Sequence, residues 1–497
     1  MTVALPRPLD VRTALRSPRL LRTEALGGLV VGLALIPEAI SFSVIAGVDP
    51  RVGLFASVTM AITISIVGGR PAMISAATGA VALVVAPVAR QHGLDYLVAT
   101  VMLAGAFQIV LGVLQISRLM RFVPRSVMVG FVNALGILLA WAQWNNLHHV
   151  PRAVYPLVAV AIAIIVLFPR LNRVVPSPLV AIVVLTVVTW TAGIDVPTVR
   201  DKGRLPDSLP PFGLPDVPVT WHTFTVIAPY ALAMALVGLM ETLMTAKFVD
   251  DLTDTHSDKS RESWGQGVAN IVTGLFGGMG GCAMIGQTMI NVRQSGARTR
   301  LSTFLAGAFL FVLLMALGDV VGRIPMAALA GVMLMVAFGT FDWHSLRTLR
   351  RMPKSETAVM VVTVIVVVAT SDLAIGVVVG VILAALLFAR RVAHLAEVER
   401  TLLTAEDGTV RAHYHVTGEL FFASSNDLYA QFDYGEDPAY VVIDFTDAHI
   451  WDASTVAALD AVTTKYQRHG TTVDVRGLNE ASTAMYERLS GHLAGAH

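Results

Sequence analysis

From about residue 24 to residue 389, long apolar stretches alternate with short polar ones. Most of the apolar stretches are near the roughly 20 residues that cross a bilayer as a helix. The pattern predicts eleven strong spans, at residues 24–46, 52–68, 95–115, 127–146, 154–169, 177–193, 224–247, 302–318, 324–339, 356–371 and 373–389. Three shorter segments, rich in small residues, begin at Ser75, Trp264 and Cys282. Together these segments predict an α-helical polytopic membrane protein with about 14 spans.

The pattern changes after residue 396. "GTVRAHYHVTGELFFASS" and "AYVVIDFTDAHIW" read as strands, and "TTVDVRG" reads as a third strand. "DASTVAALDAVTTKYQRHG" and "NEASTAMYERLSGHL" have the spacing of amphipathic helices. The alternation of strands and helices along this part of the chain predicts a small α/β domain. We therefore expect an N-terminal segment at 1–23, a membrane domain at 24–396 and the α/β domain at 397–497.

Composition supports the membrane assignment. The chain is 55% hydrophobic and 14% charged, with a mean hydropathy of +0.67, whereas soluble domains carry about 25% charged residues. The net charge of +1 indicates no nucleic-acid partner. Cys282 is the only cysteine, which excludes an intrachain disulfide, and the histidines lack metal-ligand spacing. We expect no metal, no cofactor and no enzymatic activity, because no nucleophile–base set or paired catalytic carboxylates occur.

Positive charge is distributed unevenly among the expected loops. If the N-terminus lies inside, the inside segments carry about three times as many lysines and arginines as the outside loops. An even number of spans places both termini on the same side. We therefore expect a multi-pass protein of the cell (inner) membrane, surrounded by lipid, with both termini and the α/β domain in the cytoplasm.

Two of the short segments occupy corresponding positions in the two halves of the chain. "ISAATGAV" follows Glu38 by about 40 residues, and "CAMIGQTMI" follows Glu241 at a similar distance. Paired half-helices of this kind mark substrate sites in transporters, because their N-termini favour an anion. The candidate anion-binding residues are Ala76, Ala77, Thr78, Gly79, Ile285, Gly286, Gln287 and Thr288. The alternative is that these small residues serve close helix packing.

Glu38 and Glu241 are carboxylates within apolar runs, and ionisable residues inside a membrane are usually functional. We expect Glu241 to carry a coupling proton, the alternative being a helix-end glutamate that reaches the interface. For Glu38, proton coupling and a purely structural role beside Pro37 are both open. Neither nucleotide-binding motifs nor redox ligands occur, so an ion gradient is the expected energy source.

Several motifs resemble the sulfate permease (SulP) family, in its prokaryotic form. They are "LIPEAISFSVIAGVDPRVGLFAS" and "METLMTAKF…SWGQGVANIVTGLFGGMGGCAMIGQTMINVRQSGARTRLS". The C-terminal α/β domain resembles the STAS domain of the same family. The resemblance implies a seven-plus-seven inverted repeat with core and gate domains. It also implies an anion site between the facing N-termini of spans three and ten. Members carry sulfate, bicarbonate, chloride or dicarboxylates, by symport or exchange.

The sequence departs from the family pattern at two places. Glu38 stands where members usually carry glutamine. Vertebrate members have a serine–arginine pair near Gln287 and Thr288, and this chain has no arginine at that place. We expect proton-coupled symport of a dicarboxylate or similar oxyanion by alternating access. The alternatives are a sulfate or bicarbonate/chloride exchanger, a sodium-coupled symporter and, from other classes, a membrane enzyme or a STAS-based sensor. The sequence leaves open whether two copies of the chain form a homodimer.

In the STAS-like domain, "WDASTVAALD" spans a strand-to-helix turn. Asp452 is expected to cap the helix, with Ser454 in its first turn. Ala453 and Thr455 break the Asp-Ser-Ser-Gly motif in which related antagonists are phosphorylated. Capping explains these residues, and phosphorylation of Ser454 is the alternative. A cytoplasmic regulator that acts through this domain is a further partner left open.

Overall fold

The computed structural model describes residues 10–115, 123–171, 176–203, 212–349, 351–393, 396–404 and 409–491. The chain divides into two compact units, Met1–Val381 and Ile382–His497. Residues 1–9 of the expected N-terminal segment, and residues 394 and 395 beside the expected domain boundary, lie outside the described residues.

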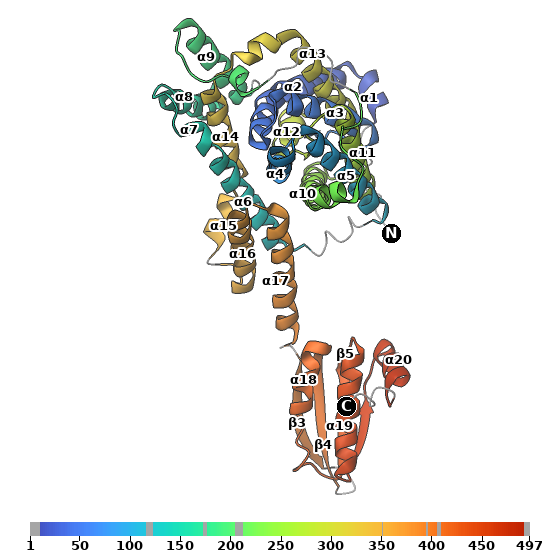
Figure 1. The fold of residues 1–497 in the computed structure, drawn as a ribbon. Helices are drawn as coiled ribbons and strands as arrows, with labels where there is room; N and C mark the ends of the chain where they lie inside the picture. The colour runs from blue at the N-terminus through green and yellow to red at the C-terminus, as the bar shows by residue number, and fades with distance from the viewer. Residues whose placement is uncertain are drawn as a thin grey trace. The chain divides into compact units, whose positions relative to one another are not determined.

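Every segment predicted to span the membrane contains a helix, and the helices of the first unit pack as two groups (Figure 1). We call the first the core group: α2 (Pro18–Ala46), α3 (Pro50–Val67), α4 (Gly79–His92), α5 (Leu94–Val113), α10 (Trp221–Thr253), α11 (Lys259–Leu275), α12 (Ile285–Met289) and α13 (Arg300–Gly322). The gate group comprises α6 (Arg125–Ala142), α8 (Val154–Leu167), α9 (Ser177–Thr191), α14 (Met326–Thr340), α16 (Lys354–Thr370) and the first part of α17 (Leu373–Ala393). Each half of the chain contributes its first four spans to the core group and its last three to the gate group.

Shorter helices complete this unit: α1 (Val11–Arg16), α7 (Trp144–Leu147), α15 (Trp343–Thr348) and 3₁₀ turns at Phe168–Arg170 and Val199–Lys202. Over the described part of the chain, seven helices have both the length and the apolar composition needed to cross a membrane. Three shorter apolar helices, Val154–Arg170, Ser177–Thr191 and Arg300–Ala316, add to them. The unit is therefore a bundle of apolar helices, as the hydropathy pattern predicts.

Small residues let the core helices approach closely. A Cβ atom on Gly105 of α5 would lie 2.6 Å from the carbonyl oxygen of Gly267 of α11. A Cβ atom on Gly267 would lie 2.4 Å from the carbonyl oxygen of Gly105. Only glycine therefore fits at this crossing, where the two backbones touch as in other membrane helix pairs.

Two of the three short segments are broken spans, as predicted. β1 (Ser75–Ala76) pairs antiparallel with β2 (Cys282–Ala283), and each two-residue strand leads into a short helix. α4 has 14 residues, about 21 Å at 1.5 Å per residue, which is shorter than the ~30 Å hydrocarbon layer. α12 has five residues, followed by a five-residue π-helix, Ile290–Gln294. The third segment, from Trp264, instead lies within the regular helix α11.

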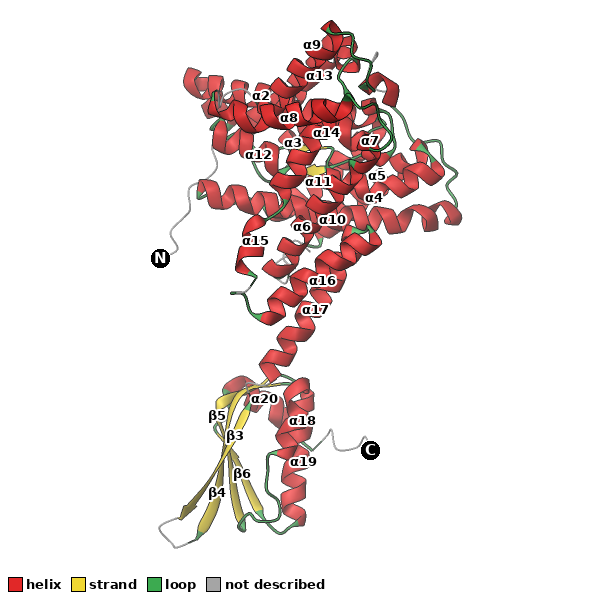
Figure 2. Cartoon of the chain, turned by 90° about the vertical axis from the view of Figure 1, so that its left-hand side faces the viewer, coloured by secondary structure: helices red, strands yellow, loops and turns green. Residues whose placement is uncertain are grey.

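The second unit contains a four-stranded sheet with the order β3–β4–β5–β6: β3 (Glu397–Thr404), β4 (Val410–Leu420), β5 (Tyr440–Ile450) and β6 (Thr472–Arg476). β3 and β4 are antiparallel, whereas β4–β5 and β5–β6 are parallel. The parallel pairs require crossover connections, which α18 (Phe422–Ala430) and α19 (Ala453–Arg468) supply, and α20 (Glu480–Leu489) follows β6. Figure 2 shows α18 and α19 along one face of this sheet.

Two elements of this unit were predicted wrongly. β3 was not predicted, because its charged and mostly exposed positions show no alternation of apolar and polar residues. "FFASS" was predicted to continue a strand but begins α18. The Asp452 carboxylate accepts hydrogen bonds from the N–H of Phe422 at 2.7 Å and of Thr455 at 3.1 Å. Asp452 therefore caps α18 as well as α19, and the first of these caps comes from 30 residues away.

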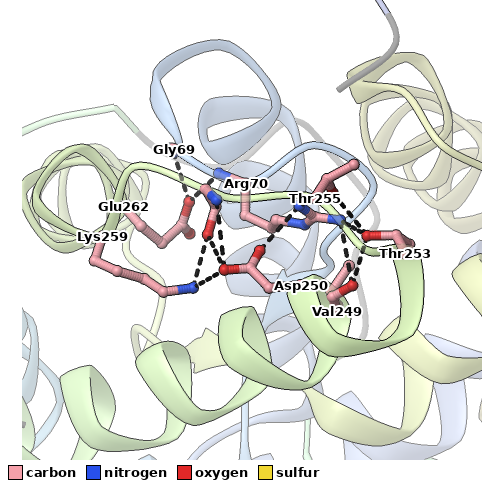
Figure 3. A network of polar contacts seen from close by, with 9 residues as sticks. Gly69, Arg70, Val249, Asp250, Thr253, Thr255, Lys259 and Glu262 are labelled. Carbon is pink, nitrogen blue, oxygen red and sulfur yellow. Dashed lines mark hydrogen bonds and ion pairs between the residues drawn. The ribbon is translucent and has the colours of Figure 1, made fainter. Parts of the chain in front are cut away.

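A charged cluster joins the loop before β1 to the α10–α11 connection (Figure 3). We call it the Arg70 cluster: Arg70, Asp250, Lys259 and Glu262, with Thr253 and Thr255. The Arg70 guanidinium donates to Asp250 at 2.9 Å, and Glu262 accepts from the backbone N–H groups of Gly69 and Arg70 at 2.6 and 2.7 Å. These contacts tie the entry of the first half-helix to α10 and α11.

Candidate functional site

A cavity of about 920 Å³ lies between the core and gate groups. Its core-group wall includes residues of α2, α4, α10 and α12: Glu38, Phe42, Thr78, Gly79, Glu241, Gly286 and Gln287. Its gate-group wall is mostly apolar: Phe131, Leu135, Leu139, Val336 and Phe341. The core side thus supplies the two half-helix starts and the carboxylates of Glu38 and Glu241, whereas the gate side is mostly apolar apart from Arg125 and Asp342.

The starts of both half-helices face this cavity. Thr78 is the N-cap of α4, and its hydroxyl accepts from the Val81 N–H at 3.4 Å. Among the described residues, the N–H groups of Gly79 in α4 and of Gly286 and Gln287 in α12 have no hydrogen-bond partner. A Cβ atom added to Gly286 would meet open space. First-turn N–H groups without partners, together with the helix dipole, suit a negatively charged ligand.

The two predicted carboxylates lie on this wall and have different partners. Gln287 Nε2 donates to Glu38 Oε1 at 2.6 Å, which links α2 to the first turn of α12. Glu241, on α10, has 8% of its surface exposed and accepts from the Cys282 thiol at 2.9 Å. A carboxylate beside an anion repels it unless a proton neutralises the charge.

Of the predicted binding residues, Thr78, Gly79, Ile285, Gly286 and Gln287 line the cavity together with Glu38 and Glu241. Three others have a different place. Ala76 pairs with Cys282 in the β1–β2 bridge, and the Ala77 N–H donates to Ser57 Oγ at 3.3 Å. Thr288 Oγ1 accepts from the Ile74 N–H at 3.0 Å. Ala76 and Thr288 thus join the two broken spans to each other, and Ala77 joins the first of them to α3.

The cavity also has charged residues that the sequence analysis did not connect with the site. Arg125, Lys247 and Asp251 line it and are exposed; they come from the start of α6 and the last turns of α10. Together with Asp342 they place two positive and two negative side chains on the cavity wall. Cys282 is a further residue that sequence reasoning missed. The sequence feature that could have pointed to Cys282 is its position as the first residue of the second small-residue segment.

Taken together, broken helices meeting beside a cavity between two helix groups define a helical membrane transporter, as in other transporters with half-helix sites. The chain matches the Sulfate permease family over residues 21–165 and 144–363, and the STAS domain over residues 403–490. It belongs to the sulfate permease family. It is an anion transporter and not an enzyme.

Individual relatives agree with this family. The chain is 52% identical over 470 residues to YbaR of Bacillus subtilis (strain 168), named "Putative sulfate transporter", covering 95% of this chain and 97% of YbaR. The solved transmembrane domain of a cyanobacterium bicarbonate transporter, BicA, matches with a TM-score of 0.64 and 26% identity, covering 74% of this chain and 98% of that domain. The overall structure of SLC26A9 matches in fold, with a TM-score of 0.80 at 15% identity, over 94% of this chain and 86% of that chain.

Proposed function

We propose that this chain is a proton-coupled symporter of a dicarboxylate or similar oxyanion. The observation that carries the proposal is the shared cavity: Glu38 and Glu241 line it together with the starts of α4 and α12. Helix starts attract an anion, while an ionised carboxylate on the same wall repels it. A proton on the carboxylate removes this repulsion, so proton and anion bind cooperatively.

Alternating access is the transport mechanism in this proposal. The cavity separates the core and gate groups, and both half-helix starts lie on its core-group side. Movement of one group against the other would carry the anion site between the two membrane faces. Arg125, Lys247 and Asp251 line the cavity at the helix ends expected on the cytoplasmic side. We therefore assign this arrangement to an inward-open state.

The second candidate is transport of sulfate or bicarbonate by exchange or sodium symport. The names of the relatives favour these anions, because one is called a sulfate transporter and another a bicarbonate transporter. The first turns of α4 and α12 suit any small oxyanion. What separates the two proposals is the coupling ion and the anion, and both can be measured.

Flux into liposomes containing the purified protein tests the proposal. Labelled sulfate, bicarbonate and C4-dicarboxylates are offered with and without an inward proton gradient, and with and without sodium. We expect C4-dicarboxylate uptake that the proton gradient accelerates. Uptake driven by sodium alone, or exchange whose rate does not depend on pH, would instead support transport of sulfate or bicarbonate by exchange or sodium symport. Saturable flux distinguishes either from a channel.

A further inference from the structure

A buried chain of hydrogen bonds joins two residues of the cavity wall. Glu241 Oε2 accepts from Cys282 Sγ at 2.9 Å, and Cys282 Sγ lies 3.0 Å from Thr78 Oγ1. Cys282 itself is fully buried and is not on the cavity wall. The carboxylate of α10 is thus connected, through the thiol of β2, to the hydroxyl that caps α4.

The number of protons determines the direction of each bond in this chain. A thiol has one proton, and here it is donated to the Glu241 carboxylate. The sulfur must then accept from Thr78, so the hydroxyl hydrogen points to the sulfur. The oxygen of that hydroxyl also accepts from the Val81 N–H. With Glu241 ionised, Thr78 therefore offers no hydrogen to an anion in the cavity.

One added proton on Glu241 allows every bond in the chain to reverse. The protonated carboxyl donates to Cys282 Sγ, the thiol donates to Thr78 Oγ1, and the Thr78 hydrogen is released toward the cavity. The hydroxyl oxygen keeps the Val81 N–H and accepts the thiol, which its two lone pairs permit. One proton is taken up in total, and no heavy atom has to change its partners.

We infer that Cys282 is a positioning residue that converts protonation of Glu241 into a new hydrogen-bond donor, the Thr78 hydroxyl, for the transported anion. This inference rests on the proposed proton coupling at Glu241 and deepens it. Loss of the like charge and gain of the donor then act together on the anion.

Other charged groups also face the cavity and contribute to the field at Glu241. They are Glu38 from α2, Arg125 from α6, Lys247 and Asp251 from α10 itself, and Asp342 before α15. Among the described residues, Cys282 is the one that donates a hydrogen bond to the Glu241 side chain. The thiol therefore provides the hydrogen-bond connection between Glu241 and the Thr78 hydroxyl.

The test compares Cys282→Ala with Cys282→Ser in the purified full-length protein. Binding of labelled fumarate and labelled sulfate is measured at mildly acidic and mildly alkaline pH. In Cys282→Ala the sulfur no longer holds the Thr78 hydrogen, so we expect alkaline binding to tighten by about fivefold, the value of one neutral hydrogen bond. Acidic binding should change little. Cys282→Ser keeps a group that both donates and accepts, so it should retain the wild-type ratio.

Thr78 variants give an independent measurement with the opposite sign. Thr78→Val removes the donor, so binding should weaken by about fivefold at acidic pH and change little at alkaline pH. Thr78→Ser keeps both the hydroxyl and the helix cap and serves as the matched control. Adding Thr78→Val to Cys282→Ala should remove the gain at alkaline pH, because the two residues act through one donor.

The outcomes separate this inference from the proposed function. If wild-type binding does not depend on pH, or Glu241→Gln keeps the dependence, the proton coupling at Glu241 fails, and the relay fails with it. If Glu241→Gln abolishes the dependence while Cys282→Ala behaves like wild type, coupling stands and the relay is overturned. Weaker binding of both Cys282 variants at both pH values would indicate a packing role and would also overturn the relay.

Discussion

At the scale of single residues, Glu241 and Glu38 differ in their partners. Glu241 is paired with a buried thiol, while Glu38 receives a side-chain amide from α12. We predict that Glu241→Gln, which mimics the protonated carboxyl, abolishes the acceleration of uptake by an inward proton gradient while binding persists. Glu38→Gln should have a smaller effect. Uptake into liposomes with and without the gradient measures both variants; the reverse ranking would move the coupling to Glu38.

Gly286 is a second residue whose surroundings lead to a prediction. It lines the cavity, and a Cβ atom there meets open space. Gly286→Trp should therefore fill the space before the α12 N–H groups and should abolish binding of the transported anion. Gly213, which is exposed and also open around its Cβ position, offers the control Gly213→Trp. Normal affinity in Gly286→Trp would place the anion site elsewhere.

At the scale of elements, the Arg70 cluster holds the loop before β1 against α10 and α11. The Arg70 side chain is 4% exposed and that of Asp250 is 13% exposed. Replacing Arg70 removes its buried hydrogen bonds to Asp250, Thr253 and Thr255, while Asp250 keeps Lys259 as an ion-pair partner. Loss of buried hydrogen bonds to a charged group costs about 2 kcal/mol. We predict that Arg70→Gln lowers the thermal stability of the detergent-solubilised protein by this order. Arg51→Gln, in an ion pair with Asp49 in which both side chains are 35% exposed, should change it little. Equal effects of both variants would contradict the assignment.

At the scale of the whole molecule, every residue assigned to the anion site lies within the first unit. We predict that the chain without residues 398–497 still binds the anion, provided that it folds and inserts. Binding of labelled substrate to the purified, monodisperse truncated protein measures this. A well-folded truncated protein without binding would show that the STAS domain is needed for the site.

The orientation of the chain is a separate prediction at the same scale. The distribution of arginines and lysines predicts that both termini lie in the cytoplasm. Reporters fused to each end, read out in intact cells, should therefore both report the cytoplasm. A reporter on the outer side at either end would reverse the orientation proposed for the cavity.

The sequence by itself determined where the membrane helices lie, because burial in hydrocarbon depends on the local run of apolar residues. It also identified the broken spans and the two carboxylates, since small residues and charges are visible within apolar runs. Only the tertiary structure decided which of these residues share a cavity. Thr78 is hydrogen-bonded to Cys282, 204 positions away in the sequence, and Gln287 to Glu38, 249 positions away. Arg70 likewise forms its ion pair with Asp250, which is 180 positions away in the sequence. Such contacts depend on how distant segments pack, and no local pattern encodes them.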